Sequence, residues 1–283
     1  MSLVSPPDPE RVAEDVARAL AEDLGSGDVS AALVADHPAG ARILCREQAV
    51  LCGTAWVDAA FHALDPGSRI TWHYRDGAQV PADALVCEIS ASARAILSAE
   101  RTALNFLQLL SATSSETARY VAALAGSRTR LLDTRKTLPG LRHAQKYAVR
   151  CGGGFNHRIG LFDAVMLKEN HIAAAGSIAA AMQAARQRFP DLPLIVEVET
   201  LEELDQVLHA GGCTRVLIDD FTPDQRREAV RRCAGRQPLE VSGGVSLEGL
   251  AEIAESGVDY VSVGGLTKHV RAIDFSLRMV ERH

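Results

Sequence analysis

The sequence predicts an α/β protein of two domains: an N-terminal α/β sandwich domain over residues 1–112 and a C-terminal βα barrel, closed or incomplete, over 113–269. Three observations lead to this fold class. The chain of 283 residues is long for a single domain. Short β-like runs lie within residues 40–90, and apolar runs alternate with amphipathic helical segments after Arg128. We expect the C-terminal segment 270–283 to form a helix that joins the N-terminal domain.

The N-terminal domain is predicted to begin with a helix. Asp8 is suited to cap this helix and Pro9 to occupy its first position. Gly25 is expected to end it. Short strands follow over residues 40–90, with a turn at Asp76-Gly77 between two of them.

Residues 93–124 predict one or two helices, in which Arg101 is the notable side chain. Leu97, Leu104 and Gln108 share a stripe, and Arg101 falls inside it. Two interpretations remain open. The arginine extends its charge from the edge of that face into water, or the stripe contacts another surface and Arg101 meets an anion there. An unpaired charge buried at such a contact would be too costly.

Six apolar, β-branched runs after residue 128 predict the strands of the C-terminal domain. Amphipathic segments such as GSIAAAMQAARQRF and SLEGLAEIAESG fill most gaps, which indicates a parallel sheet with right-handed crossovers. Continuously apolar strands indicate burial on both faces. Repeated βα units favour a closed or nearly closed barrel over an open sheet. The runs are TRLLD, DAVML, LIVEVE, RVLID, PLEVS and DYVSV.

Composition narrows the classes of function. The formal net charge of -6 offers no general basic surface for nucleic acid or an anionic membrane. No window approaches the roughly 18 apolar residues of a membrane span, and no signal peptide is visible. The cysteines lack the CxxC or CxxH spacing of metal sites. We therefore expect buried free thiols, no disulfide framework and a cytoplasmic location.

Polar residues gather where the predicted strands end. In a βα barrel the carboxyl ends of the strands converge on one rim, where the active site lies. Helix capping alone does not explain cations after two strands, carboxylates after two others and glycine pairs after the last two. The residues are Thr134-Arg135-Lys136, Lys168-Glu169-Asn170-His171, Glu197 and Glu199, Asp219-Asp220, Ser242-Gly243-Gly244 and Gly264-Gly265.

These residue types point to a phosphorylated ligand with several anionic groups. Each glycine pair is expected to precede a helix start, so its backbone amides are suited to cradle a phosphate. One phosphate monoester does not need as much positive charge as this rim offers, which indicates carboxylates as well. The cations are Arg101, Arg135, Arg158 and Lys168.

Glu197 and Asp219 are expected on neighbouring strands, facing these cations. Three roles remain open for them: binding ribose hydroxyls, holding a Mg²⁺ ion that carries a pyrophosphate, or stabilising a cationic sugar transition state. The stretch CGGGFNHRIG places His157 and Arg158 behind three glycines. It is interpreted either as further positive charge for the site or as a flexible loop.

Several motifs resemble those of the quinolinate phosphoribosyltransferase family, also called nicotinate-nucleotide pyrophosphorylase (carboxylating). The run LLDTRKTLPGLRHAQKYAVRCGGGFNHRIGLFDAVMLKENHI resembles the family signature, and ERTALNFLQLLS, LIVEVETLEEL, VLIDDF, EVSGGV and GVDYVSVGGLTKH occur in the family's order. The resemblance extends from EDLGSGD to the C-terminus. It implies a type II phosphoribosyltransferase fold and a homodimer whose N-terminal domain covers the barrel of the other subunit. Whether such dimers assemble into hexamers stays open.

The resemblance also implies roles for individual residues. Arg101 corresponds to the arginine that reaches quinolinate in the neighbouring subunit's site, and Glu197 and Asp219 to the acidic pair near ribose and metal. Asp220 stands where the family often has Asn, and Gly265 where it often has Ala, which puts only fine affinity in doubt. Quinolinate contacts are implied for Arg135, His157, Arg158 and Lys168, phosphate contacts for Lys136, Ser242, Gly243, Gly244, Val263, Gly264 and Gly265, and a further substrate contact for Thr134.

The reaction of this family joins quinolinate to phosphoribosyl pyrophosphate and gives nicotinate mononucleotide, pyrophosphate and CO₂, a step of de novo NAD biosynthesis. The resemblance implies that Lys136, Glu197 and Asp219 are catalytic. It also implies Mg²⁺ held by Glu197 and Asp219, directly or through water. No organic cofactor is expected, because the quaternised ring nitrogen itself stabilises the carbanion left by CO₂.

Three alternatives stay open. A barrel lyase acting on phosphorylated sugars would use Lys168 as an imine-forming amine, but it would leave the arginines without a role. A molybdenum-transport-associated paralogue of the same family is the second alternative, and a non-catalytic phosphosugar-binding protein is the third. Pyrophosphate release with quinolinate is the assay that best discriminates among them.

Overall fold

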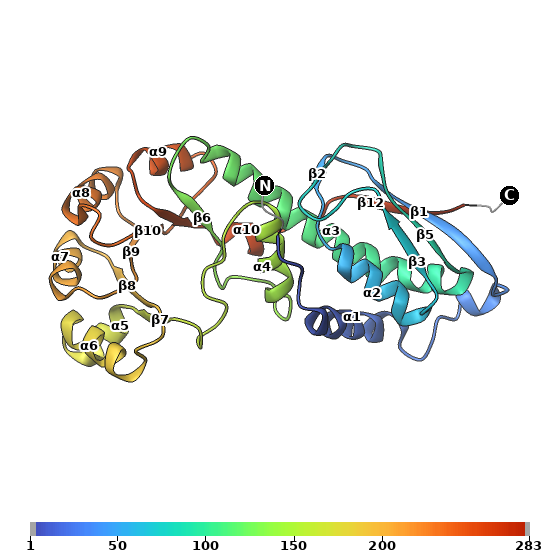
Figure 1. Ribbon diagram of the computed structural model, residues 1–283, viewed down its shortest axis with the longest axis horizontal. Coiled ribbons are helices and arrows are strands. Elements are labelled where there is room, and N and C mark those ends of the chain that lie inside the picture. Colours follow the sequence, from blue (N-terminus) through green and yellow to red (C-terminus); the bar gives the residue numbers. More distant parts are fainter. Residues whose placement is uncertain (1–3, 281–283) are drawn as a thin grey trace. The chain divides into compact units, whose positions relative to one another are not determined.

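The computed structural model describes residues 4–280 (Figure 1). The chain divides into two compact units. The predicted boundary at residue 112 falls inside α3 (Ala93–Ala123), a single helix of 31 residues. The first unit comprises residues up to Ala118, Thr137–Gly153 and Leu266 onward, and the second comprises Arg119–Lys136 and Gly154–Gly265.

The first unit is built on a four-stranded antiparallel sheet with the order β12 (Phe275–Val280), β1 (Pro38–Cys45), β5 (Ala84–Ser92) and β3 (Arg69–Trp72). A separate pair consists of β2 (Ala49–Val50) and β4 (Gln79–Val80). A large apolar core lies between the sheet and the helices of this unit. Besides most of α3, these are α1 (Pro9–Leu24), the 3-10 helix η1 (Ala31–Leu33), α2 (Thr54–Leu64) and α4 (Arg142–Cys151).

Local signals in the sequence explain the first helix. The Asp8 carboxylate accepts a hydrogen bond from the backbone N–H of Glu10 at 3.1 Å, and Pro9 occupies the first turn. Gly25 ends the helix with a φ of 51°. The predicted cap, start and end of this helix are therefore confirmed.

The helix expected over 270–283 is wrong. Phe275–Val280 forms strand β12, which pairs antiparallel with β1 so that Phe275 lies opposite Cys45. The physical reason is the period of the sequence: apolar and polar residues alternate through this segment, and a period of two suits a half-buried strand rather than a helix. The last residues of the expected helix, 281–283, lie outside the described part of the chain.

The second unit is a six-stranded parallel sheet, and all six predicted strands are confirmed. The end strands β6 and β7 do not pair with each other within residues 4–280, so the sheet is not a closed barrel and the incomplete form of the predicted fold is the one observed. The order is β6 (Arg130–Leu132), β11 (Tyr260–Ser262), β10 (Leu239–Ser242), β9 (Arg215–Asp219), β8 (Leu194–Val198) and β7 (Val165–Leu167).

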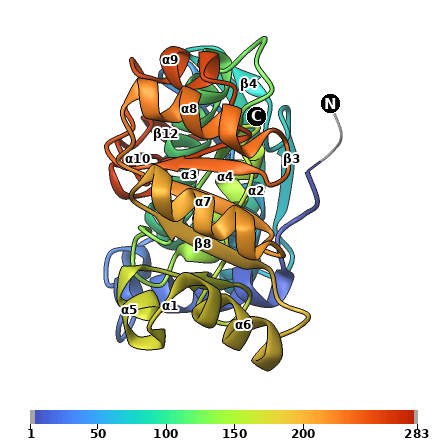
Figure 2. The same cartoon turned by 90° about the vertical axis from the view of Figure 1, so that its left-hand side faces the viewer.

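Helices connect the consecutive strands of this sheet, and Figure 2 shows α6, α7 and α8 side by side. Ser177, Thr200 and Thr222 cap these three helices, because each side chain accepts a hydrogen bond from a backbone N–H in the first turn. No helix in the described residues is long and apolar enough to cross a bilayer. The bounds are α5 (Glu169–Ala175), α6 (Ile178–Arg188), α7 (Leu201–Ala210), α8 (Pro223–Cys233) and α9 (Leu250–Glu255). The single turn α10 (Gly265–Lys268) follows β11 and belongs to the first unit from Leu266 on.

Candidate active site

One face of the parallel sheet carries charged side chains toward the carboxyl ends of its strands. The register places Glu197 on β8 beside Leu217 on β9, and Leu217 beside Glu240 on β10. Asp219 is two residues beyond Leu217 and therefore on the same face, directly beside Ser242. The predicted carboxylates and the start of the Ser242 glycine loop thus share one edge of the sheet.

An ion pair joins the ends of two neighbouring strands. Lys168, which follows β7, places its Nζ 2.8 Å from Oε1 and 2.6 Å from Oε2 of Glu197. The Glu197 side chain is almost entirely buried, whereas 42% of the Lys168 side chain is exposed. The pair therefore presents its cation to solvent and to any ligand. An imine-forming lyase would use this amine as a nucleophile, whereas here the Nζ of Lys168 is bound by both oxygens of Glu197.

Arg158 lies within electrostatic range of Arg135 and of Glu197. Burial lowers the pKa of Arg158, and the positive charge of Arg135 lowers it further. The charges of Asp163 and Glu197 oppose this shift. Arg158 also donates from Nη1 to the backbone carbonyl of Ala164 at 3.3 Å. Arg135 and Arg158 therefore repel each other, and an anion bound by both would relieve that repulsion.

The segment around His157 is anchored rather than flexible. Asp133 is fully buried and accepts hydrogen bonds from Asn156 Nδ2 at 2.5 Å and from the backbone N–H of His157 at 2.8 Å. His157 Nδ1 accepts the backbone N–H of Arg158 at 2.6 Å. Its Nε2 lies 3.5 Å from Oε2 of Glu240. The segment therefore delivers Arg158 at a fixed place.

Other side chains pass close to the glycines at two strand ends. A Cβ at position 264 would lie 2.8 Å from Cδ of Lys136 and 3.4 Å from Oγ1 of Thr134. A Cβ at position 243 would overlap the Asp220 carboxylate, and Gly243 also has a φ of 91°. Asp220 itself has a φ of 53°, a backbone conformation in which Asp and Asn are both enriched. The departure from the family's usual Asn therefore keeps the local backbone.

The expectation that each glycine pair precedes a helix start is wrong for one pair. After Gly243 and Gly244 the chain continues as a loop, and α9 begins only at Leu250. Gly265 does begin α10, but that helix is a single turn ending at Lys268. A phosphate at these loops would therefore meet backbone amides rather than the dipole of a long helix.

Asp219 and Glu197 differ in their availability to a metal ion. Within residues 4–280 no hydrogen bond or ion pair engages the Asp219 carboxylate, whereas both oxygens of Glu197 are bound by Lys168. Mg²⁺ takes oxygen ligands and keeps several waters. Asp219 therefore fits a direct or water-mediated contact to Mg²⁺. Glu197 fits a position next to the ion without binding it, because Lys168 already compensates its negative charge.

Arg101 lies in the first unit, whereas every other predicted site residue belongs to the second. The predicted stripe divides: Leu104 is buried and Gln108 half-buried, while Leu97 and Arg101 are exposed. The second unit contains the remaining candidates, Thr134, Arg135, Lys136, His157, Arg158, Lys168, Glu197, Asp219, Ser242, Gly243, Gly244, Val263, Gly264 and Gly265.

Sequence reasoning missed three charged residues that support this site. Glu240, Arg215 and Asp133 lie inside or directly beside apolar strand runs. Glu240 and Asp133 are completely buried, and Arg215 pairs with Glu240 at 2.7 Å. The available signal was a charge within a strand otherwise predicted to be apolar on both faces, because such a charge needs a buried partner.

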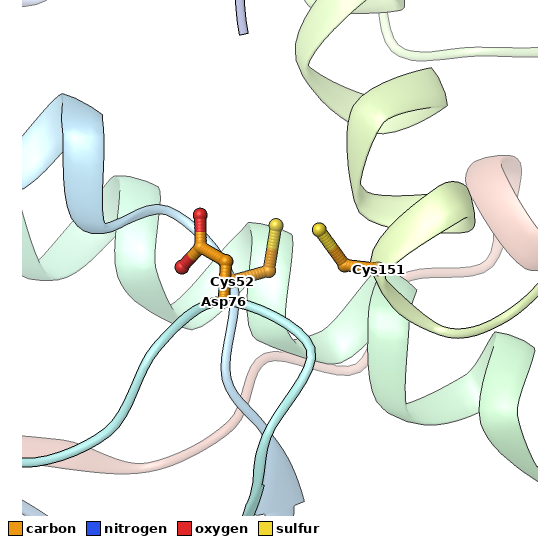
Figure 3. A group of neighbouring side chains, drawn as sticks. All are labelled: Cys52, Asp76 and Cys151. Carbon is orange, nitrogen blue, oxygen red and sulfur yellow. The ribbon is translucent and has the colours of Figure 1, made fainter. Parts of the chain in front are cut away.

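All six cysteines are free and buried, as predicted. The sulfurs of Cys52 and Cys151 and a carboxylate oxygen of Asp76 lie within 4.8 Å of one another (Figure 3). Burial, and then the hydrogen bond with Cys151, raise the pKa of Cys52 well above its ordinary value. Asp76 already accepts hydrogen bonds from the backbone N–H of Gly53 and the hydroxyl of Tyr147. Asp76 therefore caps the start of α2 beside the buried Cys52 thiol, whose raised pKa disfavours the thiolate that a metal ion needs.

Comparisons with known proteins agree along nearly the whole chain. Family models described as the N-terminal and C-terminal domains of quinolinate phosphoribosyl transferase match residues 28–111 and 113–278. The chain is 43% identical over 276 residues to the nicotinate-nucleotide pyrophosphorylase (carboxylating) of Mycobacterium leprae, covering 93% of this chain and 95% of that protein.

A plant relative and a solved structure extend the comparison. The chain is 39% identical over 282 residues to the chloroplastic nicotinate-nucleotide pyrophosphorylase (carboxylating) of Arabidopsis thaliana, covering 92% of this chain and 80% of that one. The structure of the nicotinate-nucleotide pyrophosphorylase from Francisella tularensis superposes with a TM-score of 0.95 at 44% identity, covering 99% of this chain and 100% of that one. The chain therefore belongs to the quinolinate phosphoribosyltransferase family.

Proposed function

We propose that this protein transfers the phosphoribosyl group of phosphoribosyl pyrophosphate to quinolinate with loss of CO₂, forming nicotinate mononucleotide and pyrophosphate for NAD biosynthesis. The observation that carries the proposal is the ion pair of Lys168 with Glu197 at the strand ends. It is supported by the charges of Arg135 and Glu197, both of which act on Arg158. Two guanidinium groups suit a rigid ligand with two carboxylates, because each planar fork binds one carboxylate through paired hydrogen bonds. Quinolinate is such a ligand.

The proposed chemistry follows from where charge develops. As the bond between C1 of the ribose and the pyrophosphate oxygen breaks, positive charge grows on the sugar. The carboxylates of Glu197 and Asp219, on one face of the sheet, stabilise that charge. The ring nitrogen of quinolinate, with its two carboxylates held by Arg135 and Arg158, forms the new bond to C1.

Decarboxylation then needs no separate electron acceptor. The ring nitrogen carries a formal positive charge once it is bound to the sugar. When CO₂ leaves, the electron pair of the C2–carboxylate bond stays on C2, where the adjacent positive charge stabilises it. A proton then takes the place of CO₂.

The phosphates of the second substrate meet a different part of the site. Glycine at position 264 lets the Lys136 side chain pass beside the end of β11. We assign the phosphates to Lys136 and to the backbone around Gly243 and Gly264, with Thr134, Ser242, Gly244, Val263 and Gly265 beside them. When bound, Mg²⁺ neutralises charge on the pyrophosphate leaving group. Asp219 is the residue that would hold the ion, directly or through water.

We further propose that two copies of the chain share their sites, with Arg101 serving the partner's site. Arg101 is exposed on α3 beside Leu97, one turn earlier. The Ser98 hydroxyl on this helix donates a hydrogen bond of 2.8 Å to the Asp28 carboxylate, which joins the segment after Asp28 to the helix. Leu33, in that segment, is 88% exposed. Exposed apolar side chains next to an unburied cation suit a contact with a protein partner that has an anionic ligand bound beside the contact.

A cytoplasmic location is the remaining part of the proposal. Six free, buried thiols are typical of a reducing compartment.

One assay tests the function. The purified protein is supplied with Mg²⁺, phosphoribosyl pyrophosphate and quinolinate labelled in its C2 carboxylate. We expect pyrophosphate and labelled CO₂ to appear in equal amounts, and only when both substrates are present. Nicotinate, which lacks the second carboxylate, should give no turnover. Pyrophosphate release that does not depend on quinolinate, or equal rates with both acids, would refute the proposal.

A further inference from the structure

Glu240 is a carboxylate buried completely inside the parallel sheet. It lies mid-strand on β10, on the same face as Glu197, with Leu217 between them. Its side chain is 0% exposed. Burying a carboxylate costs several kcal/mol unless partners compensate it. The side chains that compensate the charge of Glu240 therefore indicate why it is buried there.

Two side chains approach this carboxylate, the guanidinium of Arg215 and the ring of His157. Arg215 Nε lies 2.7 Å from Oε2 of Glu240, and His157 Nε2 lies 3.5 Å from the same oxygen. Arg215 is itself fixed by stacking over the ring of Tyr260, 4.9 Å from its centroid. Burial would raise the pKa of Glu240, but the close approach of the His157 ring and of the Arg215 guanidinium outweighs this effect, and the pKa lies below its ordinary value.

The hydrogen bonds of His157 define which ring nitrogen carries the proton. Nδ1 accepts the backbone N–H of Arg158 at 2.6 Å, so Nδ1 bears no proton. The proton is therefore on Nε2, the nitrogen that faces Glu240. Because the backbone N–H of His157 donates to Asp133, the ring and the backbone are fixed from opposite sides.

We propose that Glu240 is a positioning residue for the binding of the dicarboxylate. Through the His157 ring it fixes the backbone of Arg158, and so it fixes the place from which the Arg158 guanidinium reaches the site. The inference rests on the proposed function, in which Arg158 binds quinolinate. It also gives His157 a role beside the quinolinate contact implied by the family resemblance, because its ring links Glu240 to Arg158.

The first test is the substitution Glu240→Gln, which keeps the shape of the side chain and removes its charge. A neutral amide satisfies His157 and Arg215 less well, so Arg158 should lose its fixed position. We expect the KM for quinolinate to rise about tenfold, the effect of one lost charge-assisted hydrogen bond, while the KM for phosphoribosyl pyrophosphate and kcat change little. Glu255→Gln, an exposed change on α9, is the matched control and should match the unmodified enzyme in all three.

An equal rise in both KM values, or an unchanged KM for quinolinate, would overturn the proposal. A general loss of packing would move both KM values and kcat together, so the split between the two substrates identifies positioning. Glu240→Asp shortens the side chain but keeps the charge, and should fall between the unmodified enzyme and Glu240→Gln.

A double variant tests whether Glu240 acts through His157. If it does, Glu240→Gln combined with His157→Gln should raise the KM for quinolinate no more than the larger of the two single changes. Multiplication of the two effects would overturn the link. Should Glu240→Gln fail to fold, the ¹⁵N spectrum of the histidines in the unmodified enzyme decides, with His157 assigned by its loss in His157→Gln. A proton on Nδ1 rather than Nε2 would overturn the proposal.

Arg158→Ala separates this inference from the proposed function. If Arg158→Ala leaves quinolinate binding unchanged, the assignment of the dicarboxylate site fails and the inference fails with it. If Arg158→Ala abolishes quinolinate binding while Glu240→Gln binds it normally, only the positioning role fails.

Discussion

Each of the two main sheets contains an arginine–glutamate pair between neighbouring strands, and the two pairs have opposite surroundings. In the antiparallel sheet Arg42 on β1 lies directly opposite Glu88 on β5. Their charged atoms are 3.0 Å apart, and 50% and 43% of the two side chains are exposed. In the parallel sheet Arg215 and Glu240 are 2.7 Å apart, with 16% and 0% exposed. Water screens the first pair and hardly reaches the second.

This difference shows how the two units divide stability and chemistry. The first unit buries apolar side chains in a large core and leaves this ion pair on its surface. On the charged face of the second unit a small apolar cluster of Ala164, Ile195 and Leu217 lies among ionised groups. Part of the interior of the second unit is therefore occupied by charged side chains. Buried charges lower stability unless they are paired, so their presence indicates a role in orienting a site.

The largest expected effect concerns Arg101, a proposed site residue that lies in the first unit although the other proposed site residues lie in the second. Arg101→Ala should abolish turnover if this side chain completes the partner's site, although it is exposed on α3. Lys136→Ala should also be inactive. Mixing the two variants should restore about a quarter of the activity, because half the dimers combine both chains and each holds one intact site of two. The measurement is pyrophosphate release after confirmed exchange of subunits.

Failure of the mixed sample to recover any activity would contradict the shared site. Arg94→Ala is a matched control, because Arg94 is an exposed arginine on the same helix that donates to the backbone carbonyl of Val34. It should keep normal turnover.

The second effect concerns the buried pair. Arg215→Met keeps the length of the side chain but leaves Glu240 without its arginine. The free energy of unfolding should fall by about 3–5 kcal/mol, the cost of a buried charge that has lost its partner. Urea unfolding followed by circular dichroism measures it. Replacing both residues, with Arg215→Met and Glu240→Gln together, should recover part of the loss. A loss in Arg215→Met below about 1 kcal/mol would mean that water reaches Glu240.

The same pair predicts a dependence of stability on pH. The pKa of Glu240 is lowered in the folded protein, mainly because His157 and Arg215 outweigh its burial. A carboxyl group with a lowered pKa stabilises the fold above its unfolded pKa of about 4.3, and this contribution disappears as the pH falls through the folded value. Unfolding curves of the unmodified protein and Glu240→Gln should therefore converge as the pH falls below about 4. A constant difference between the two down to pH 2 would contradict the assignment.

The contrast between the units also explains what could be predicted from the sequence. The six parallel strands and the first helix depend on periodicity and caps within a few residues, and these signals are local. Strand β12 pairs with β1, more than two hundred positions earlier. Its alternating pattern was present in the sequence, but nothing local tells which edge it joins.

The site divides in the same way. Lys168, Glu197 and Asp219 could be found because polar residues at strand ends converge on one edge of a parallel sheet. The role of Glu240 could not be predicted, because a charge in the run PLEVS does not indicate which side chain pairs with it. Its partner His157 is far away in the sequence. Buried polar partners are a property of the folded sheet rather than of any segment.

A smaller effect is expected where the site meets the phosphates. In Gly264→Ala the new methyl group would meet Cδ of Lys136, a flexible side chain that can move away. The fold should remain stable, while the KM for phosphoribosyl pyrophosphate should rise about tenfold, or 1.4 kcal/mol. Gly249→Ala is the control, since the nearest atom to its Cβ is 3.8 Å away. An equal change in both variants would show that Lys136 does not depend on this glycine.

The smallest effect is expected at the exposed pair of Arg42 and Glu88 in the antiparallel sheet. Arg42→Ala removes a partner from Glu88, but water solvates the carboxylate that remains, since 43% of that side chain is exposed. The free energy of unfolding should fall by less than about 1 kcal/mol, and the loss should shrink further in high salt. Urea unfolding at low and high ionic strength measures both. If Arg42→Ala destabilises the protein as much as Arg215→Met does, solvent exposure is not what separates the two pairs, and the buried charges of the parallel sheet need another explanation.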